Sequence, residues 1–225
     1  MSDNTVMTVL GPASPGALGV VDAHSHLYIA PVAGGAADAP VLVDEAGIGR
    51  ELAAFRAAGG GAIVDCQPGG CGRDGRVLRR LSEQSGVHVV ASTGFHRRRY
   101  YPPDVPLFSL SAEAAADLFR DEIANGLVET RVDDGRRTTD DGGRTRAVDG
   151  RRSAVAFPGV IKIAAEASIE ASPLALFEAA AAVARETGCA IEIHTERGAA
   201  VESLLAFFVA RGLSPRRLVF CHVDK

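Results

Sequence analysis

The sequence predicts an α/β protein of the TIM-type (β/α)8 barrel kind, of which about six βα units are present. Short apolar runs alternate with longer helical segments, which is typical of parallel strands joined by right-handed crossovers. The runs are continuously apolar, as expected of strands covered on both faces. A doubly wound sheet fits the same alternation, but it is disfavoured because no Gly-x-Gly-x-x-Gly follows the first run. Polar residues at the carboxyl ends of several runs favour the barrel, where such ends converge on one site.

The expected strands are apolar runs of strand length. They cover residues 20–24, 62–66, 87–91, 159–164, 190–194 and 218–222. Helices are expected between them, over residues 44–58, 73–85 and 111–125, from residue 172 onwards, and over 199–211. Ser111 opens the third of these helices, and Pro173 suits the first turn of the fourth.

The composition fits one globular domain over residues 1–225. Of the 225 residues 47% are hydrophobic, which is ample for one core. The net charge of −4 favours neither nucleic acid nor an anionic membrane as a partner. No stretch approaches the roughly 18 apolar residues of a membrane span, and residues 1–19 lack the features of a signal peptide. Cysteines in or beside the strands suit a reducing compartment, so we expect a cytoplasmic protein.

Residues 129–157 interrupt the alternation of strand and helix. They hold seven arginines, six acidic residues and four glycines, with little apolar content. This composition predicts a flexible, solvated insertion. Because the segment joins a helix to the next strand, we expect it at the amino-terminal face of the barrel, away from the chemistry.

Lys162 is the most informative residue for function. It lies in an apolar run that resembles a buried strand, where a free ammonium group is costly. The chain has 24 basic residues, and all of them except Lys162 and Lys225 are arginine. Arginine stays charged, whereas a buried lysine can lose its proton and react as a nucleophile. The alternative is a core lysine whose amine reaches the surface.

Four histidines lie toward the carboxyl ends of expected strands: His24, His26, His194 and His222. His24 and His26 are two residues apart, so they lie on the same side of an extended chain and can bind one metal ion. Imidazole suits zinc, and also manganese, iron or cobalt, so the ligand type does not fix the metal. Together with Lys162, the four histidines predict a site for two divalent metal ions.

The chemistry of such a site points to hydrolysis. A neutral Lys162 amine can react with carbon dioxide to form a carbamate, whose two oxygens can bridge two ions. Two ions about 3.5–4 Å apart can share a hydroxide with a pKa near neutrality, while one ion polarises a carbonyl or phosphoryl oxygen. We therefore expect a metal-dependent hydrolase in which this hydroxide attacks the substrate and Lys162 is the catalytic residue.

Two further histidines flank the third expected strand. His96 follows it and, together with Phe95, is a candidate to line the substrate pocket. A loop position beside Arg97 is an equally good interpretation of His96. His88 begins the same strand, at the face opposite the site, and is expected to be structural.

These residues resemble the phosphotriesterase family of the amidohydrolase superfamily, over nearly the whole chain. The resemblance is carried by residues 6–12, 18–19, 72–74, 91–94, 159–162, 194–195, 212–215 and 221–224, together with the His-x-His strand. It implies that His24 and His26 bind the more buried ion. It also implies that a carboxylated Lys162 bridges two ions, with Zn²⁺ the expected metal, and that His194 and His222 bind the other ion. Members of this family hydrolyse lactones, phosphotriesters and related esters on a (β/α)8 barrel.

The chain departs from the family pattern in two places. Ser25 stands between His24 and His26, where many members have glutamate. The family's last metal ligand is an aspartate on the eighth strand, and the sequence ends at Lys225, after the sixth. We therefore expect a truncated barrel with two unpaired edges, covered in a homodimer or by a complementing chain. We also expect the isolated chain to bind metal weakly.

Other functions stay open from the sequence. A TatD-like nuclease also begins with His-x-His, but it would have glutamate in place of Lys162. A dihydroorotase-like cyclic amidase shares the carboxylated lysine, but not the pattern of residues 8–12. An inactive fragment or binding remnant fits the absence of the aspartate. The particular ester or lactone substrate is not fixed by these residues.

Overall fold

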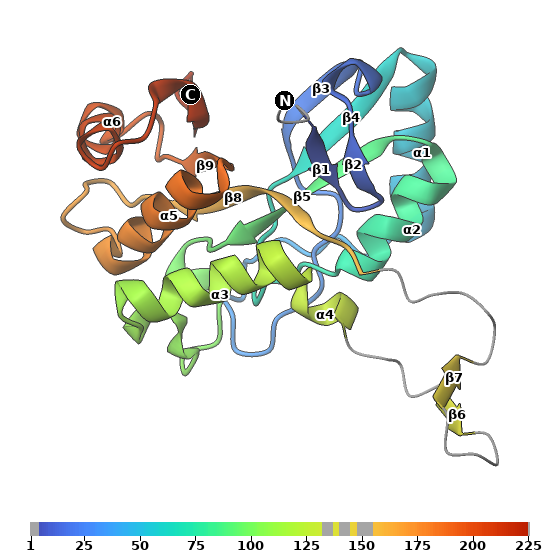
Figure 1. The fold of residues 1–225 in the computed structure, drawn as a ribbon, viewed down its shortest axis with the longest axis horizontal. Coiled ribbons are helices and arrows are strands. Elements are labelled where there is room, and N and C mark those ends of the chain that lie inside the picture. Colours follow the sequence, from blue (N-terminus) through green and yellow to red (C-terminus); the bar gives the residue numbers. More distant parts are fainter. Residues whose placement is uncertain (1–4, 132–136, 140–144, 148–154, 225) are drawn as a thin grey trace.

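The computed structural model describes residues 5–131, 137–139, 145–147 and 155–224. Its centre is a six-stranded parallel sheet with the strand order β10-β9-β8-β5-β4-β3 (Figure 1). The strands are β3 (Val20–Ser25), β4 (Gly60–Asp65), β5 (His88–Gly94), β8 (Pro158–Ala164), β9 (Ala190–His194) and β10 (Leu218–Cys221). All six strands expected from the sequence are present, with bounds that differ by at most three residues.

The strand order confirms the barrel over the doubly wound sheet. Strands that are neighbours in the sheet are also consecutive among the parallel strands of the chain, so every crossover steps in the same direction. The sheet therefore curls into a nearly closed barrel with its helices outside (Figure 1). These helices are α1 (Glu45–Ala57), α2 (Gly75–Ser85), α3 (Ala112–Asn125), α4 (Val128–Arg131), α5 (Leu174–Thr187) and α6 (Val201–Ala210).

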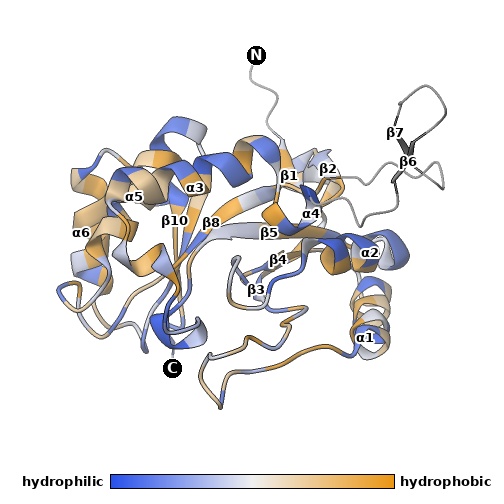
Figure 2. Ribbon diagram, turned by 90° about the horizontal axis from the view of Figure 1, so that it is seen from below, coloured by the Kyte–Doolittle hydropathy of each residue, from blue (hydrophilic) through white to orange (hydrophobic). Residues whose placement is uncertain are grey.

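Two apolar clusters hold the helices to the sheet. One includes Phe177 of α5 and Phe208 of α6, packed against the β8 and β9 side of the sheet. The other includes Leu52 of α1 and Leu78 of α2, packed near β4 and β5. In Figure 2, α2 and α3 show alternating polar and apolar stretches, as expected of helices with one face in the core.

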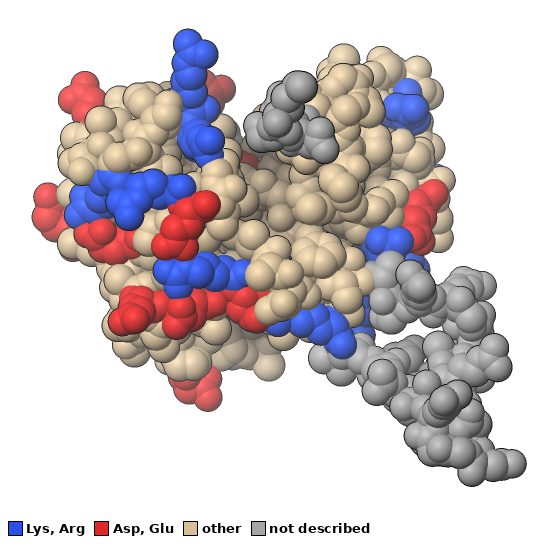
Figure 3. All heavy atoms as spheres, viewed as in Figure 1, with Lys and Arg blue, Asp and Glu red and all other residues tan. Residues whose placement is uncertain are grey.

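Ion pairs link neighbouring helices on the outer surface. Arg120 of α3 pairs with Glu186 of α5 at 2.6 Å, and Arg211 after α6 pairs with Glu178 of α5. Figure 3 shows basic and acidic side chains side by side over these helices. Exposed pairs of this kind contribute at most about 1 kcal/mol each, so the apolar clusters carry most of the packing energy.

A short antiparallel hairpin precedes the barrel. It consists of β1 (Val6–Thr8) and β2 (Gly11–Ala13), and no strand was expected there from the sequence. The backbone N–H of Val9 donates to the carbonyl of Val89 at 2.8 Å, near the start of β5. A Cβ at Gly159, near the start of β8, would lie 2.2 Å from the Met7 carbonyl oxygen. The hairpin therefore crosses the amino ends of β5 and β8, opposite the ends that carry the histidines.

The outer strands β3 and β10 each pair on one side only within the described residues. Val20 on β3 is 66% exposed and Val219 on β10 is 43% exposed. The expectation of two unpaired edges is thus confirmed for this part of the chain. Among the described helices, none is both long and apolar enough to cross a membrane.

Much of the expected insertion over residues 129–157 lies outside the described residues. Its described interior contains a second antiparallel hairpin, formed by β6 (Arg137–Thr139) and β7 (Thr145–Ala147). Both ends of the segment belong to the packed domain. Glu129 and Thr130 lie in α4, and Ala156 is fully buried. The packed structure therefore extends further at both ends than the composition suggested.

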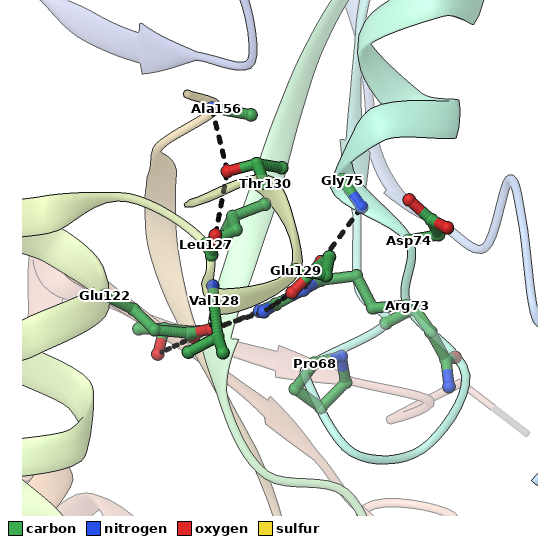
Figure 4. A network of polar contacts seen from close by, with 12 residues as sticks. Pro68, Arg73, Asp74, Gly75, Glu122, Leu127, Val128, Glu129, Thr130 and Ala156 are labelled. Atoms are coloured by element: carbon green, nitrogen blue, oxygen red, sulfur yellow. Dashed lines mark hydrogen bonds and ion pairs between the residues drawn. The ribbon is translucent and has the colours of Figure 1, made fainter. Parts of the chain in front are cut away.

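Glu129 belongs to a buried ionic network around Arg73, just before α2 (Figure 4). The Arg73 guanidinium donates to Glu129 at 2.8 Å, to Glu122 at 3.1 Å and to the carbonyl of Ser92 at 2.7 Å. Thr93 donates its hydroxyl to Glu122 at 2.7 Å. One cation therefore holds α3 and α4 against β5 and the start of α2.

Replacing Arg73 with methionine should cost about 3–5 kcal/mol of unfolding free energy, because two buried carboxylates lose their cation. Urea unfolding followed by circular dichroism measures this cost. The matched control is Arg80→Met, which removes an exposed partner of Glu45 and should cost less than about 1 kcal/mol. Equal costs for the two variants would contradict a stabilising role of the buried network.

Candidate metal centre

Five histidines meet at the carboxyl ends of the strands. Their imidazoles form a closed ring in the order His24, His26, His96, His194 and His222, with neighbouring centroids 4.8 to 6.1 Å apart. The four histidines proposed from the sequence as metal ligands are therefore brought together. His96 completes the ring from the end of β5.

All five histidines line one cavity of about 610 Å³. The long loop after β3 forms much of its wall through residues 29–32, 36–37 and 39–42, all of which are apolar. In Figure 2 this loop, between β3 and α1, runs below the ends of the strands. The cavity thus combines a polar group of histidines with an apolar wall.

The chain bends at His222, directly after β10. This residue has a φ of 62°, in the left-handed region that side chains other than glycine rarely adopt. Its ring lies edge-on to His24 at 4.8 Å and close to His194 at 4.9 Å. Backbone strain of this kind is found where a fixed side-chain position is needed for function.

Glu192 of β9 lies behind the ring and was not singled out from the sequence. Its Oε1 contacts His24 Nδ1, Cys66 Sγ at 2.8 Å, Cys221 Sγ at 3.1 Å and Lys162 Nζ at 3.3 Å. Burial alone would raise the pKa of this carboxyl, but the hydrogen bond with His24 and the charge of Lys162 lower it below its usual range. An ionised carboxylate only accepts hydrogen bonds, so His24 carries a proton on Nδ1, and in the neutral ring the lone pair is then on Nε2.

Gln67 determines the tautomer of His26. Its amide nitrogen donates to the carbonyl of Cys71, which can only accept. The amide oxygen therefore faces His26 Nδ1, at 2.7 Å, and accepts a hydrogen bond from it. Burial lowers the pKa of His26 to about 4, so near neutral pH the ring is uncharged with its lone pair on Nε2.

His194 is held by its other ring nitrogen. Its Nε2 lies 3.1 Å from Glu196, whose carboxyl has a pKa lowered by this hydrogen bond. The lone pair of His194 is therefore on Nδ1. Arg97 in turn contacts Glu196 and pairs with Glu166 at 2.8 Å. Metal-binding histidines commonly have one ring nitrogen fixed in this way by a carboxylate or an amide.

Lys162 lies beneath the histidines. On β8 it is in register with Gly94 of β5 and Glu192 of β9, and its side chain is fully buried. Besides Glu192, its amine contacts Cys221 Sγ at 3.8 Å. The alternative of a core lysine that reaches the surface is therefore wrong.

The donor set fits divalent metal ions. His24 and His26 have lone pairs on Nε2 and His194 on Nδ1, and neutral imidazole is a common metal ligand. In addition, the ligand atoms of His24, Cys66 and Glu192 lie within 4.8 Å of one another and could hold an ion. Burial raises the pKa of the Cys66 thiol, which favours its protonated form and thus the first arrangement.

Phe95 lies elsewhere than expected. Its ring is fully buried and packs against Phe108 and Phe177, with centroids 6.0 Å away in each case. It belongs to the core beneath α3 and α5 and not to the wall of the histidine-lined cavity. The prediction that Phe95 contacts the substrate does not fit this buried position. His88 lies at the opposite end of β5, where a structural role was expected.

Two of the residues missed in the sequence had readable signals. Glu192 is an acid inside an apolar strand, two positions before His194 and thus on the same face. Gln67 follows the end of an expected strand directly, where site residues of a barrel are found. The link between Glu196 and Arg97 joins two loops, and no spacing in the sequence indicates it.

The chain belongs to the phosphotriesterase family, whose model matches residues 4–157. It is 27% identical to a phospho-furanose lactonase of Mycoplasmopsis agalactiae, over 99% of this chain and 61% of the relative. An N-acetyltaurine hydrolase of Rattus norvegicus is 29% identical, over 56% of this chain and 44% of the relative. The solved structure of an amidohydrolase from Mycoplasma synoviae matches with a TM-score of 0.77 at 22% identity, over 99% of this chain and 61% of that chain. The chain therefore spans less than two thirds of the length of these relatives.

Gly94 lets β5 and β8 approach each other beside Lys162. Its φ is 104°, and a Cβ there would lie 2.0 Å from the Lys162 carbonyl oxygen. We expect Gly94→Ala to cost about 2–5 kcal/mol of unfolding free energy, measured by urea unfolding, through strain and overpacking.

Gly86→Ala is the matched control for this prediction. Gly86 also has a positive φ, of 67°, but a Cβ added there would have no atom within 4 Å. This substitution should cost only about 1–2 kcal/mol, from the left-handed backbone alone. If the two variants lose the same stability, the close approach at Lys162 is not a constraint.

Proposed function

We propose that this chain forms most of the metal centre of a hydrolase that uses two divalent ions. The observation that supports this best is the ring of histidines, three of which have one ring nitrogen anchored and the other available as a ligand. His24 and His26 would hold one ion, and His194 and His222 the other. Lys162 would bridge them after its amine and carbon dioxide form a carbamate with release of a proton.

When bound, the two ions would polarise the carbonyl or phosphoryl oxygen of the substrate and lower the pKa of the attacking water. The protein residues fix the geometry of this centre. Glu192 and Gln67 hold the rings of His24 and His26, and Glu196 holds His194. Zn²⁺ is the ion we propose, while Mn²⁺, Fe²⁺ and Co²⁺ can use the same ligands.

The proposed substrate is a small lactone, ester or phosphotriester. The apolar wall formed by residues 29–32, 36–37 and 39–42 suits the uncharged part of such a molecule. The lactonase relative supports this class. Amide hydrolysis is the second candidate, because a relative that covers half of the chain is an N-acetyltaurine hydrolase. We propose a cytoplasmic protein that acts on neither nucleic acid nor membranes.

We also propose that further βα units, in the same chain or in a complementing one, pair with the free edges of β3 and β10. Exposed valines on both edge strands support this. Such a segment would supply the aspartate that the family places on its eighth strand. A homodimer is the other way to cover these edges, and a non-catalytic remnant is the alternative if neither arrangement gives activity.

In the chain complemented by a fragment with two further βα units, Lys162→Ala should reduce bound zinc from two ions per chain to one or fewer, because the bridge between the ions is lost. Zinc per chain is measured by mass spectrometry of the metal after exhaustive dialysis. Added acetate, which can take the place of the carbamate, should restore part of the occupancy. His88→Ala is the control and should retain both ions. Two ions retained in Lys162→Ala would disprove the bridging role.

Zinc-loaded protein should hydrolyse γ-nonanolactone or 4-nitrophenyl acetate, and a chelator should abolish this rate until Zn²⁺ is returned. The assay is run on the chain alone and with a supplied fragment containing two further βα units. Faster hydrolysis of N-acetyltaurine than of either ester would favour the amidase candidate. Absence of metal binding and of every rate, with and without the fragment, would favour the remnant.

A further inference from the structure

His96 differs from the other histidines of the ring in the partner of its Nδ1. The backbone N–H of Arg97 donates to His96 Nδ1 at 2.7 Å. A nitrogen that accepts a hydrogen bond carries no proton, so the ring is neutral and its proton is on Nε2. His24 and His26 have the opposite tautomer, because their Nδ1 atoms donate to Glu192 and Gln67.

The ring of His96 lies beside the rings of two proposed metal ligands. Its ring centroid lies 6.1 Å from that of His26 and 5.1 Å from that of His194. The side chain lines the same cavity as both. Among the hydrogen bonds of the described residues, none engages His96 Nε2, and this atom is not one of the buried polar atoms without a partner. The N–H is therefore accessible, and the histidine-lined cavity is one of two pockets that His96 lines.

The ring of His96 is held rigidly by its neighbours. Its backbone N–H donates to the hydroxyl of Tyr101 at 3.0 Å, and the ring packs edge-on against Tyr100 at 4.9 Å. Arg97, which supplies the donor to Nδ1, is itself fixed by ion pairs with Glu166 and Glu196. A donor that is already oriented needs no reorganisation when charge develops on a substrate oxygen.

We infer that His96 is a catalytic hydrogen-bond donor, which binds the carbonyl or leaving-group oxygen of the ester or lactone through Nε2–H. The part of this inference that concerns the substrate rests on the proposed function. The part that concerns the tautomer does not. His26 and His194, which flank His96, are proposed ligands of different ions. An oxygen held at the metal centre therefore lies within reach of the His96 ring. In this assignment the five histidines divide into four ligands and one donor.

The first test is the tautomer, read in metal-free protein labelled with ¹⁵N-histidine. Long-range ¹H–¹⁵N spectra distinguish a protonated ring nitrogen from a bare one, and the His96→Gln variant identifies the signals of His96. We expect the proton on Nε2 of His96 and on Nδ1 of His26. A proton on Nδ1 of His96 would overturn the inference, whether or not the protein is found to be a hydrolase.

The second test compares two substitutions at His96. In His96→Gln the amide nitrogen can take the place of Nε2–H, whereas in His96→Asn the amide replaces Nδ1 and leaves no group at Nε2. With 4-nitrophenyl acetate, or the lactone if that is the better substrate, kcat/KM should fall about 10²–10³-fold in His96→Asn. It should fall much less in His96→Gln, and both variants should keep two zinc ions.

His88→Asn is the matched control, because His88 lies on the same strand outside the site. It should keep the wild-type rate and metal content. A wild-type rate in His96→Asn would overturn the donor role. Loss of one ion in His96→Asn would also overturn it and would make His96 a metal ligand instead. Failure of the proposed function is recognised separately, by the absence of metal and activity in the unsubstituted chain.

Discussion

The carboxylate of Glu192 is the interaction on which the site depends. It is almost fully buried and has contacts with His24, Cys66, Lys162 and Cys221. These partners come from β3, β8 and β10 and from the end of β4, so one anion joins elements across the whole sheet. A buried charge without partners costs several kcal/mol. A shift of strand register that separated Glu192 from these partners would therefore be strongly unfavourable.

The same hydrogen bonds decide the chemistry of the histidines. The tautomer of each ring follows from a group that can only accept or only donate a hydrogen bond. This group is the Glu192 carboxylate for His24 and the backbone N–H of Arg97 for His96. For His26 it is the Cys71 carbonyl, which orients the amide of Gln67. Chemically identical side chains are thereby held in different tautomers. A metal ion and a substrate oxygen need opposite partners, a lone pair and a proton, and the ring presents both.

The rest of the fold holds this edge of the sheet in place. Arg73 fastens α3 and α4 behind β5, and the β1–β2 hairpin crosses the amino ends of β5 and β8. Gly94 then allows β8 to approach β5 where Lys162 lies. The hairpin lies at the amino ends of the strands, whereas Arg73 and Gly94 lie close to the cavity. Ala30 of the cavity wall donates its backbone N–H to the Gly72 carbonyl, next to Arg73, and His96 follows Gly94 by two residues.

The sequence by itself determined the order of strands and helices and the barrel, and it singled out four histidines of the ring as metal ligands and His96 as a candidate for the pocket. These follow from local patterns: apolar runs fix the strands, and polar residues at their carboxyl ends must meet at one edge. Only the tertiary structure decided that Phe95 lies in the core, that Glu192 faces Lys162 and that His96 carries its proton on Nε2. Each of these depends on which atom faces a side chain in the folded structure, and neither residue type nor spacing encodes that.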